Sequence, residues 1–197
     1  MAHHPRPLIV GLGGAARENS SSEKALKVAL AAAAAQGMET VLISGAALDL
    51  PLYAPHQSAR AERAVQMIDV LRRCDGLILS SPSYHGSISG LVKNALDYTE
   101  DMGRDERIYF DGCPVGLIGC GAGWQGAHQV LTAMRGIVHA LRGWPTPLGA
   151  VLNTAQALFN EAGHCVDEAA RFQLETVGQQ VAQFVHMKSR AAQPVAA

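Results

Sequence analysis

One short stretch near the amino terminus carries the residue types that bind phosphate. Residues 13–22 have the sequence Gly-Gly-Ala-Ala-Arg-Glu-Asn-Ser-Ser-Ser, between a short apolar run and a segment with helical spacing. Glycines let backbone amides approach an anion, and a helix N-terminus offers unpaired N–H groups and a positive dipole. Arg17, Ser20 and Ser22 add a guanidinium and two hydroxyls. The stretch predicts an anion site, with a plain serine-capped helix as the alternative.

A second stretch has the composition of a binding loop. Residues 80–90, Ser-Ser-Pro-Ser-Tyr-His-Gly-Ser-Ile-Ser-Gly, follow an apolar run and precede a helical pattern. Their backbone amides can meet the polar edge of a flat heterocycle, while Tyr84 and Ile88 offer apolar contact to a ring face. The alternative is a tight strand-to-helix turn in which Ser89 caps the helix and Tyr84 is partly buried packing.

The elements that must position these loops alternate along the chain. Short apolar runs predict strands, and three-to-four-residue spacing predicts helices. The expected strands are 8–12, 40–43, 76–79, 115–118 and 148–152, and the expected helices are 23–36, 61–73, 89–98, 127–141 and 167–187, with loops at 46–60, 103–112 and 153–163. This alternation predicts an α/β fold, a doubly wound parallel sheet with helices on both faces. Ligands of such sheets bind beyond the carboxyl ends of the strands, so we expect residues 13–22, 80–90 and 119–126 to meet there.

Composition narrows the classes of protein. The chain has 197 residues, 48% of them hydrophobic and 17% charged, with a formal net charge of -1. We expect one folded domain over 1–197 with frayed tails at 1–7 and 188–197. The near-neutral charge predicts no nucleic-acid partner. No membrane association is expected, since the longest apolar run is 28–35 and a spanning helix needs about 20 residues. No signal-peptide pattern is present, so we expect a cytoplasmic protein. We also expect free thiols at Cys74, Cys113, Cys120 and Cys165.

Competing motifs are weaker. Gly11-x-Gly13-x-x-Ala16 matches the dinucleotide-binding fingerprint of Rossmann domains, but that site also needs an acidic residue at the end of the second strand, where Ile43 is followed by serine and glycine. A metal site is not expected, because the histidines include no H-E-x-x-H pair. A response-regulator receiver needs acidic residues directly after the first strand, and residues 11–16 contain none.

The loops carry a resemblance to the NADPH-dependent FMN reductase family of the flavodoxin-like fold. The family's first loop has the form G-S-x-R-x-x-S, matched from Gly14 to Ser20 with Arg17 in place. The more specific second motif resembles P-x-Y-x-x-S-x-x-G-x-x-K-N-x-x-D, matched by Pro82, Tyr84, Ser87, Gly90, Lys93, Asn94 and Asp97. A third loop, residues 119–126, is glycine-rich as in the family. The resemblance extends over residues 8–185.

The resemblance implies a five-stranded sheet of order 2-1-3-4-5 and a site for FMN. In that site Arg17, Ser20 and Ser22 hold the phosphate, the ring is flanked by Pro82, Ser83, Tyr84, His85, Gly86, Ser87 and Ile88, and Gly121 and Gly123 belong to the loop that closes it. The flavin carries the chemistry, so no catalytic side chain is expected. Two departures stand out. Ala15 replaces the family's usual serine, which removes about 1 kcal/mol of hydrogen bonding, and His85 replaces the commoner asparagine.

The resemblance also implies an activity, in which a hydride passes from NADPH to flavin and electrons then reach free flavin, a quinone, an azo compound or a metal oxyanion. The alternative is a non-catalytic electron carrier or redox-sensing module of the same fold. Small carriers of this fold are generally strongly acidic, which a net charge of -1 does not match. Family members are usually dimers or tetramers, for which Trp124 and Trp144 offer apolar surface, and a flavin-dependent monooxygenase is a further candidate partner.

Overall fold

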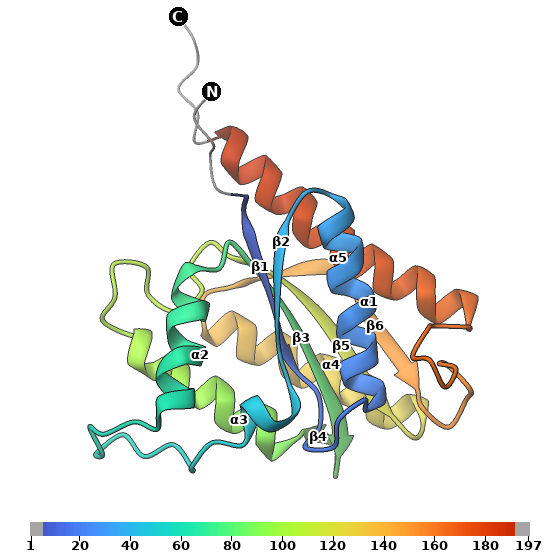
Figure 1. The fold of residues 1–197 in the computed structure, drawn as a ribbon, viewed down its shortest axis with the longest axis horizontal. Helices are drawn as coiled ribbons and strands as arrows, with labels where there is room; N and C mark the ends of the chain where they lie inside the picture. Colours follow the sequence, from blue (N-terminus) through green and yellow to red (C-terminus); the bar gives the residue numbers. More distant parts are fainter. Residues whose placement is uncertain (1–5, 192–197) are drawn as a thin grey trace, which may run out of the picture.

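The computed structural model describes residues 6–191 as a parallel sheet between two groups of helices (Figure 1). The parallel strands are β1 (Leu8–Gly13), β2 (Glu39–Ile43), β3 (Gly76–Tyr84), β5 (Pro114–Gly121) and β6 (Trp144–Asn153). They pair in the order β2-β1-β3-β5-β6. This order, in which β5 and β6 are the fourth and fifth parallel strands, confirms the predicted flavodoxin-like sheet.

The two faces of the sheet bury separate hydrophobic cores. Helices α1 (Ser21–Ala35) and α5 (Glu168–Ala191) cover one face, and α2 (Glu62–Arg73), α3 (Gly90–Asp97) and α4 (Trp124–Ala140) cover the other. Within β1, Ile9 belongs to the first core while Val10 and Leu12 belong to the second. Because successive strand residues point to opposite faces, an uninterrupted apolar run is what a doubly covered strand requires.

The strand register brings the carboxyl ends of four strands to one edge. Gly13 pairs with Ser80, Pro82 with Cys120, and Gly121 with Asn153. The segments that follow β1, β3, β5 and β6 therefore leave the sheet side by side. Residues 13–22, 80–90 and 119–126 share this edge, as predicted.

Strand β3 corrects the prediction that residues 80–90 form a loop. The strand continues past Leu79 to Tyr84, turns at His85 and Gly86, and pairs antiparallel with β4 (Ser87–Ile88). Both turn residues have positive φ, 50° and 83°, as two-residue hairpins require. Hydrophobic patterning ended the strand too early because Ser80 and Ser81 are polar, yet both are fully buried and hydrogen-bonded.

Several other boundaries differ from the prediction. Helix α4 begins at Trp124, three residues early, and β6 begins at Trp144, where Pro145 and Pro147 are tolerated because β6 is an edge strand. The predicted loop 46–60 begins within the 3₁₀ helix η1 (Gly45–Leu48), and the 3₁₀ helix η2 (Tyr98–Met102) follows α3 before the predicted loop 103–112.

The predicted tails are partly wrong. Helix α5 continues to Ala191, so residues 188–191 are helical, and the Pro7 carbonyl accepts a hydrogen bond from the Glu39 N–H at 2.8 Å. The expectation for 1–5 and 192–197 lies outside the described residues. Between residues 6 and 191 no helix has the length and apolar character needed to cross a membrane.

Candidate functional site

The segment between β1 and α1 folds tightly against β3. Gly13 and Gly14 adopt φ of 141° and 108°, and the Gly14 N–H donates to the Ser80 carbonyl at 3.0 Å. A Cβ on Gly13 would lie 1.9 Å from that carbonyl oxygen, so no other residue fits there. The glycine pair therefore lets the chain turn sharply and deliver residues 15–22 to the edge of the sheet.

Helix α1 presents its N-terminus at this edge. Ser20 is the N-cap, and its Oγ accepts a hydrogen bond from the Glu23 N–H at 3.3 Å. Ser22 Oγ lies 3.3 Å from Ser20 Oγ, and both serines are buried, whereas Arg17 is exposed. The N–H groups of the first helical turn have no partner inside the helix. Free N–H groups, hydroxyls and a guanidinium together form a donor set suited to an oxyanion.

The Glu23 side chain bonds to the segment that precedes α1. One carboxylate oxygen accepts the Asn19 N–H at 3.1 Å, and the other pairs with the Lys27 Nζ at 2.6 Å. Asn19 has φ of 55°, so the carboxylate fixes an otherwise unfavourable backbone conformation. Glu23 is the acidic residue in the first turn of α1. Its contact with Asn19 gives it a role in shaping the loop that carries Arg17.

The ends of β5 and β6 form a further wall. The Thr154 N–H donates to the Gly121 carbonyl at 2.7 Å, which joins the two strand ends. Cys120 lies beneath this wall and is almost fully buried, and burial raises the pKa of its thiol to about 12. The thiol therefore stays protonated at neutral pH and contributes a neutral, weakly polar surface.

These segments enclose a cleft of about 490 Å³, within the usual range for small-molecule sites. It is lined by Ala15, Ala16, Arg17, Ser20, Ser21, Ser22, Pro82, Ser83, Tyr84, Cys120, Gly121, Ala122 and Thr154. Arg17 is the one charged residue in this lining, so the cleft favours an anionic ligand. The lining includes Arg17, Ser20, Ser22, Pro82, Ser83, Tyr84 and Gly121 from the predicted site residues.

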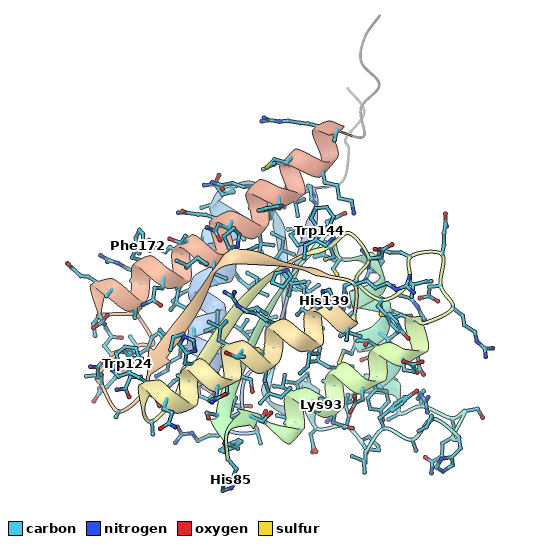
Figure 2. The ribbon with its side chains drawn as sticks, turned by 180° about the vertical axis from the view of Figure 1, so that it is seen from behind. His85, Lys93, Trp124, His139, Trp144 and Phe172 are labelled. Carbon is cyan, nitrogen blue, oxygen red and sulfur yellow. The ribbon has the colours of Figure 1, made fainter. Side chains whose placement is uncertain are left out.

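The remaining predicted residues lie elsewhere. Ile88 is only 8% exposed and packs in the hydrophobic core, so its side chain is not available as the expected contact to a ring face. His85, Gly86 and Ser87 form the hairpin tip and its return strand, and His85 projects away from the body of the molecule (Figure 2). Gly123 is the N-cap of α4. Hydrophobicity alone could not separate Ile88 from Tyr84, which is 55% exposed.

Sequence reasoning missed several lining residues. Thr154 was not predicted, although it directly follows β6 and the rule that ligands bind beyond strand ends applies to it as well. Ser21 and Ala122 lie in the predicted segments 13–22 and 119–126 but were not singled out. Cys120, which lies in the predicted segment 119–126, also lines the cleft. Gly11 of the competing dinucleotide motif packs against α1 instead, because a Cβ there would lie 2.7 Å from Leu30.

The final part of the second motif anchors a neighbouring segment. The Asn94 carboxamide accepts the Tyr53 N–H at 2.8 Å and donates to the carbonyls of Leu50 and Pro51 at 3.3 and 3.0 Å. Lys93 and Asp97 form an exposed ion pair one helical turn apart. Asn94 therefore acts on the long segment after β2, and neither it nor the ion pair lines the cleft.

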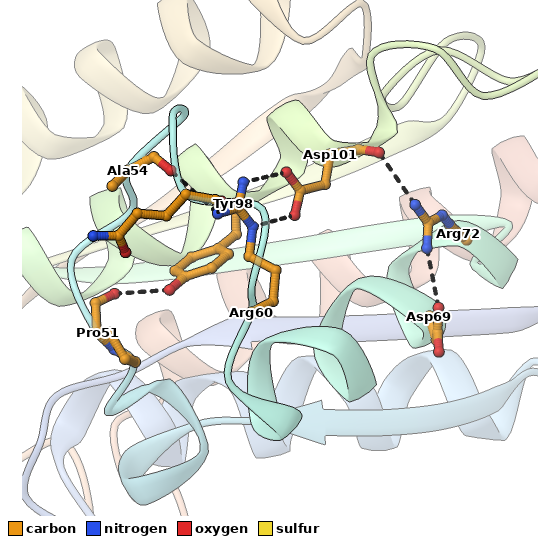
Figure 3. Close-up of polar contacts among 8 residues, drawn as sticks. Pro51, Ala54, Arg60, Asp69, Arg72, Tyr98 and Asp101 are labelled. Atoms are coloured by element: carbon orange, nitrogen blue, oxygen red, sulfur yellow. Dashed lines mark hydrogen bonds and ion pairs between the residues drawn. The ribbon is translucent and has the colours of Figure 1, made fainter.

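Figure 3 shows the second anchor of that segment. Arg60 donates to both carboxylate oxygens of Asp101, at 2.7 and 2.8 Å, and its guanidinium lies 4.8 Å from the centre of the Tyr53 ring. The Tyr98 hydroxyl donates to the Pro51 carbonyl at 2.9 Å. The Arg60 ion pair lowers the pKa of Asp101, chiefly through these hydrogen bonds. Residues 50–60 are thus held at both ends by side chains of α3 and η2.

Other surface features fit a ligand site less well. A groove of about 740 Å³ runs between α1, α5 and residues 162–165, along the outer side of the helices and away from most strand ends. Within residues 6–191 no three His, Cys, Asp or Glu side chains gather as a metal site would require, and the four cysteines are free thiols. The cleft at the strand ends remains the best candidate.

Known proteins resemble this chain in sequence and in fold. Residues 7–157 match the model of the NADPH-dependent FMN reductase family. An FMN-dependent NADPH-azoreductase of Staphylococcus aureus (strain USA300) is 39% identical over 100 residues, which are 51% of this chain and 50% of the relative, so the match spans about half the length of each.

Solved structures agree at the level of the fold. The flavoenzyme NAD(P)H:(acceptor) oxidoreductase FerB from Paracoccus denitrificans superposes with a TM-score of 0.74 at 19% identity, covering 92% of this chain and 98% of that one. The apo form of the NADH:FMN oxidoreductase EMOB gives 0.69 at 20% identity, over 95% and 92% of the two chains. The family model covers most of the chain, including the β1–α1 segment and the β3–β4 hairpin, and the chain therefore belongs to the NADPH-dependent FMN reductase family.

Proposed function

We propose that the chain is an FMN-dependent NAD(P)H oxidoreductase that binds FMN in the cleft at the strand ends. The observation that carries this proposal is the donor set at the α1 N-terminus, with Arg17 as the one charge in the lining. When bound, FMN accepts a hydride from NADPH and passes electrons to a second acceptor. The chain's own residues bind and orient the flavin, and residues 1–197 act as one FMN-binding domain.

The phosphate end of FMN fits the β1–α1 segment. Arg17 supplies a guanidinium, Ser20, Ser21 and Ser22 supply hydroxyls, and the first turn of α1 supplies N–H groups. No carboxylate of residues 6–191 lines the cleft, and the nearby Glu23 is paired with Lys27. A dianionic group therefore meets donors and no repelling charge. Ala15 leaves the set one hydroxyl short of the family pattern.

The isoalloxazine end fits the part of the cleft formed by the ends of β3 and β5. Pro82, Ser83 and Tyr84 follow one strand, and Gly121 and Ala122 follow its neighbour. The backbone amides and mostly small side chains of these residues leave room for a flat ring whose polar edge needs hydrogen bonds. Tyr84 stands at the mouth, and His85 and Gly86 extend the hairpin beyond it.

The acceptor is expected to be a flat, small molecule. The names of the relatives include an azoreductase and an NAD(P)H:(acceptor) oxidoreductase, which supports testing azo compounds alongside quinones, free flavin and metal oxyanions. Reduced flavin released from the site would suit a flavin-dependent monooxygenase.

We further propose that the protein is a homodimer or homotetramer, because Trp124 and Trp144 are 55% and 62% exposed and a contact between subunits would cover them. We also propose that it is cytoplasmic.

An anaerobic assay tests the proposed activity. Purified protein is mixed with FMN, NADPH or NADH is added, and flavin absorbance is followed against a protein-free sample. Bleaching much faster than in the control supports the reductase. Flavin that binds but stays oxidised supports the electron-carrier or sensor alternative, and absence of FMN binding contradicts both.

A further inference from the structure

The first turn of α4 is wedged against the end of β5. A Cβ on Gly119 would lie 2.3 Å from the Ala127 carbonyl oxygen, and one on Gly121 would lie 2.8 Å from the Ala127 nitrogen. These are contacts of backbone with backbone, which cannot be relieved by rotating a side chain. Helix α4 is therefore held firmly on this side.

The same turn touches the β3–β4 hairpin on its other side. Gly126 faces Ser83, and a Cβ at position 126 would lie 2.9 Å from the Ser83 Oγ and 3.4 Å from its Cβ. Glycine is a poor helix former, and alanine would be preferred by about 1 kcal/mol in a helix interior. A side chain at position 126 would therefore displace the Ser83 hydroxyl or push on the strand that carries it.

Ser83 lies on the least supported part of β3. Pairing of β3 with β5 ends at Pro82 and Cys120, so Ser83 and Tyr84 pair only with the two residues of β4. Both also line the cleft. Any pressure from α4 therefore moves this strand end, or turns the Ser83 hydroxyl toward the cleft, before it moves α4 off β5.

We infer that Gly126 is a positioning residue that sets the width of the cleft, by letting Ser83 and Tyr84 stand close to α4, and so selects the size of the flat acceptor admitted beside the flavin. This inference rests on the proposed function. Gly126 itself does not line the cleft and acts only through Ser83.

The test compares Gly126→Ala with a matched change on the same helix. A Cβ on Gly136 meets nothing within 4 Å, so Gly136→Ala makes the same substitution in open space. We expect Gly126→Ala to raise the FMN dissociation constant and the KM for a bulky azo dye by about 10-fold, the scale of one overpacked contact, with a smaller change for a small quinone. Gly136→Ala should leave all three values at the wild-type level.

Rescue separates positioning from general damage. Ser83→Ala removes the Oγ that the new Cβ would meet and leaves the 3.4 Å approach to Cβ. The double variant Gly126→Ala/Ser83→Ala should recover most of the FMN affinity and of the preference between the two acceptors. Far-UV circular dichroism and thermal unfolding check that each variant is folded.

The outcomes distinguish this inference from the proposed function. FMN affinity is measured by fluorescence titration and needs no turnover, so it reports on Gly126 even if NADPH fails to reduce the flavin. The inference is overturned if Gly126→Ala matches Gly136→Ala in FMN affinity, or if Ser83→Ala gives no rescue. A wild-type protein that binds FMN but does not oxidise NADPH refutes the reductase and leaves the positioning result standing.

Discussion

The parallel strands begin at one end of the sheet, here the amino edge, and finish at the other, here the carboxyl edge. Polar groups at these two ends are bonded in different ways. At the amino edge, Arg107 donates to the carbonyls of Leu71 and Arg72, at 2.8 and 2.9 Å, and to that of Cys74. The Asp75 carboxylate accepts the Leu8 N–H at 2.8 Å. These hydrogen bonds satisfy backbone groups at the end of α2 and at the start of β1, and they contribute to the stability of the fold.

The carboxyl edge has polar groups without such partners. Arg17 is exposed and has no carboxylate partner within residues 6–191, and it lines the cleft together with Ser20, Ser21 and Ser22 at the start of α1. The Arg107 guanidinium at the amino edge is bonded within the fold. We propose that the Arg17 guanidinium at the carboxyl edge binds a ligand instead. Substitutions at the two edges should therefore change different measurements.

The largest expected effect is on stability at the amino edge. Arg107→Ala removes charged donors from three carbonyls at the end of α2, and we expect a loss of about 2–4 kcal/mol in the free energy of unfolding. Urea unfolding measures this. Arg104→Ala is the matched control, since Arg104 is exposed and its side chain makes no hydrogen bond inside the described chain. A similar loss in both variants would remove the distinction between the edges.

The corresponding change at the carboxyl edge should affect binding instead. Arg17→Ala removes a charge-assisted contact to the phosphate, and we expect the FMN dissociation constant to rise about 10- to 100-fold while urea unfolding of the ligand-free protein is unchanged. Flavin fluorescence titration measures the affinity, again with Arg104→Ala as control. Loss of stability without loss of affinity would reverse the assignment of the two edges.

A third prediction concerns how stability at acid pH depends on the Arg60–Asp101 ion pair, which holds residues 50–60. Arg60 lowers the pKa of Asp101, so this ion pair stabilises the fold above the unfolded carboxyl's pKa of about 3.9 and is lost as pH falls through the lowered folded value. Asp101→Asn should therefore be less stable than the wild type at neutral pH, and the difference should shrink below pH about 4. Thermal unfolding across this range measures it. A gap independent of pH would exclude the ion pair as its source.

The smallest expected effect is a gain in affinity. Ala15→Ser restores the hydroxyl that the family pattern places in the phosphate segment, and one net hydrogen bond should tighten FMN binding about 3- to 10-fold. Ala31→Ser makes the same chemical change on the exposed side of α1 and should leave affinity unchanged. Equal affinities in both variants would mean that position 15 does not reach the phosphate.

Local patterns predicted the sheet well because they reflect burial. The run at residues 8–12 is apolar on both faces, and β1 is covered on both. The order of the strands was implied by the family resemblance and not by these patterns. The predicted end of β3 was wrong because the burial of Ser80 and Ser81 depends on hydrogen bonds with Ser22 and Ser89. Ser22 is distant from Ser80 in the sequence, and Ser89 lies across the hairpin from Ser81. Polarity at a single position cannot reveal such partners.

The candidate site was predictable where it depends on strand ends and not where it depends on tertiary contact. Arg17 and the serines follow a buried strand directly, so their place in the cleft could be foreseen. The core position of Ile88, the hold of Glu23 on Asn19 and the hold of Asn94 on residues 50–53 depend on neighbours distant in sequence or on the local backbone path.

The central claim is that the phosphate of FMN binds at the N-terminus of α1. Titrating the wild-type protein with FMN and with riboflavin, which lacks the phosphate, tests it directly. We expect FMN to bind at least about 10-fold more tightly than riboflavin, and Arg17→Ala to remove most of this difference. Equal affinity for the two flavins in the wild-type protein would contradict it.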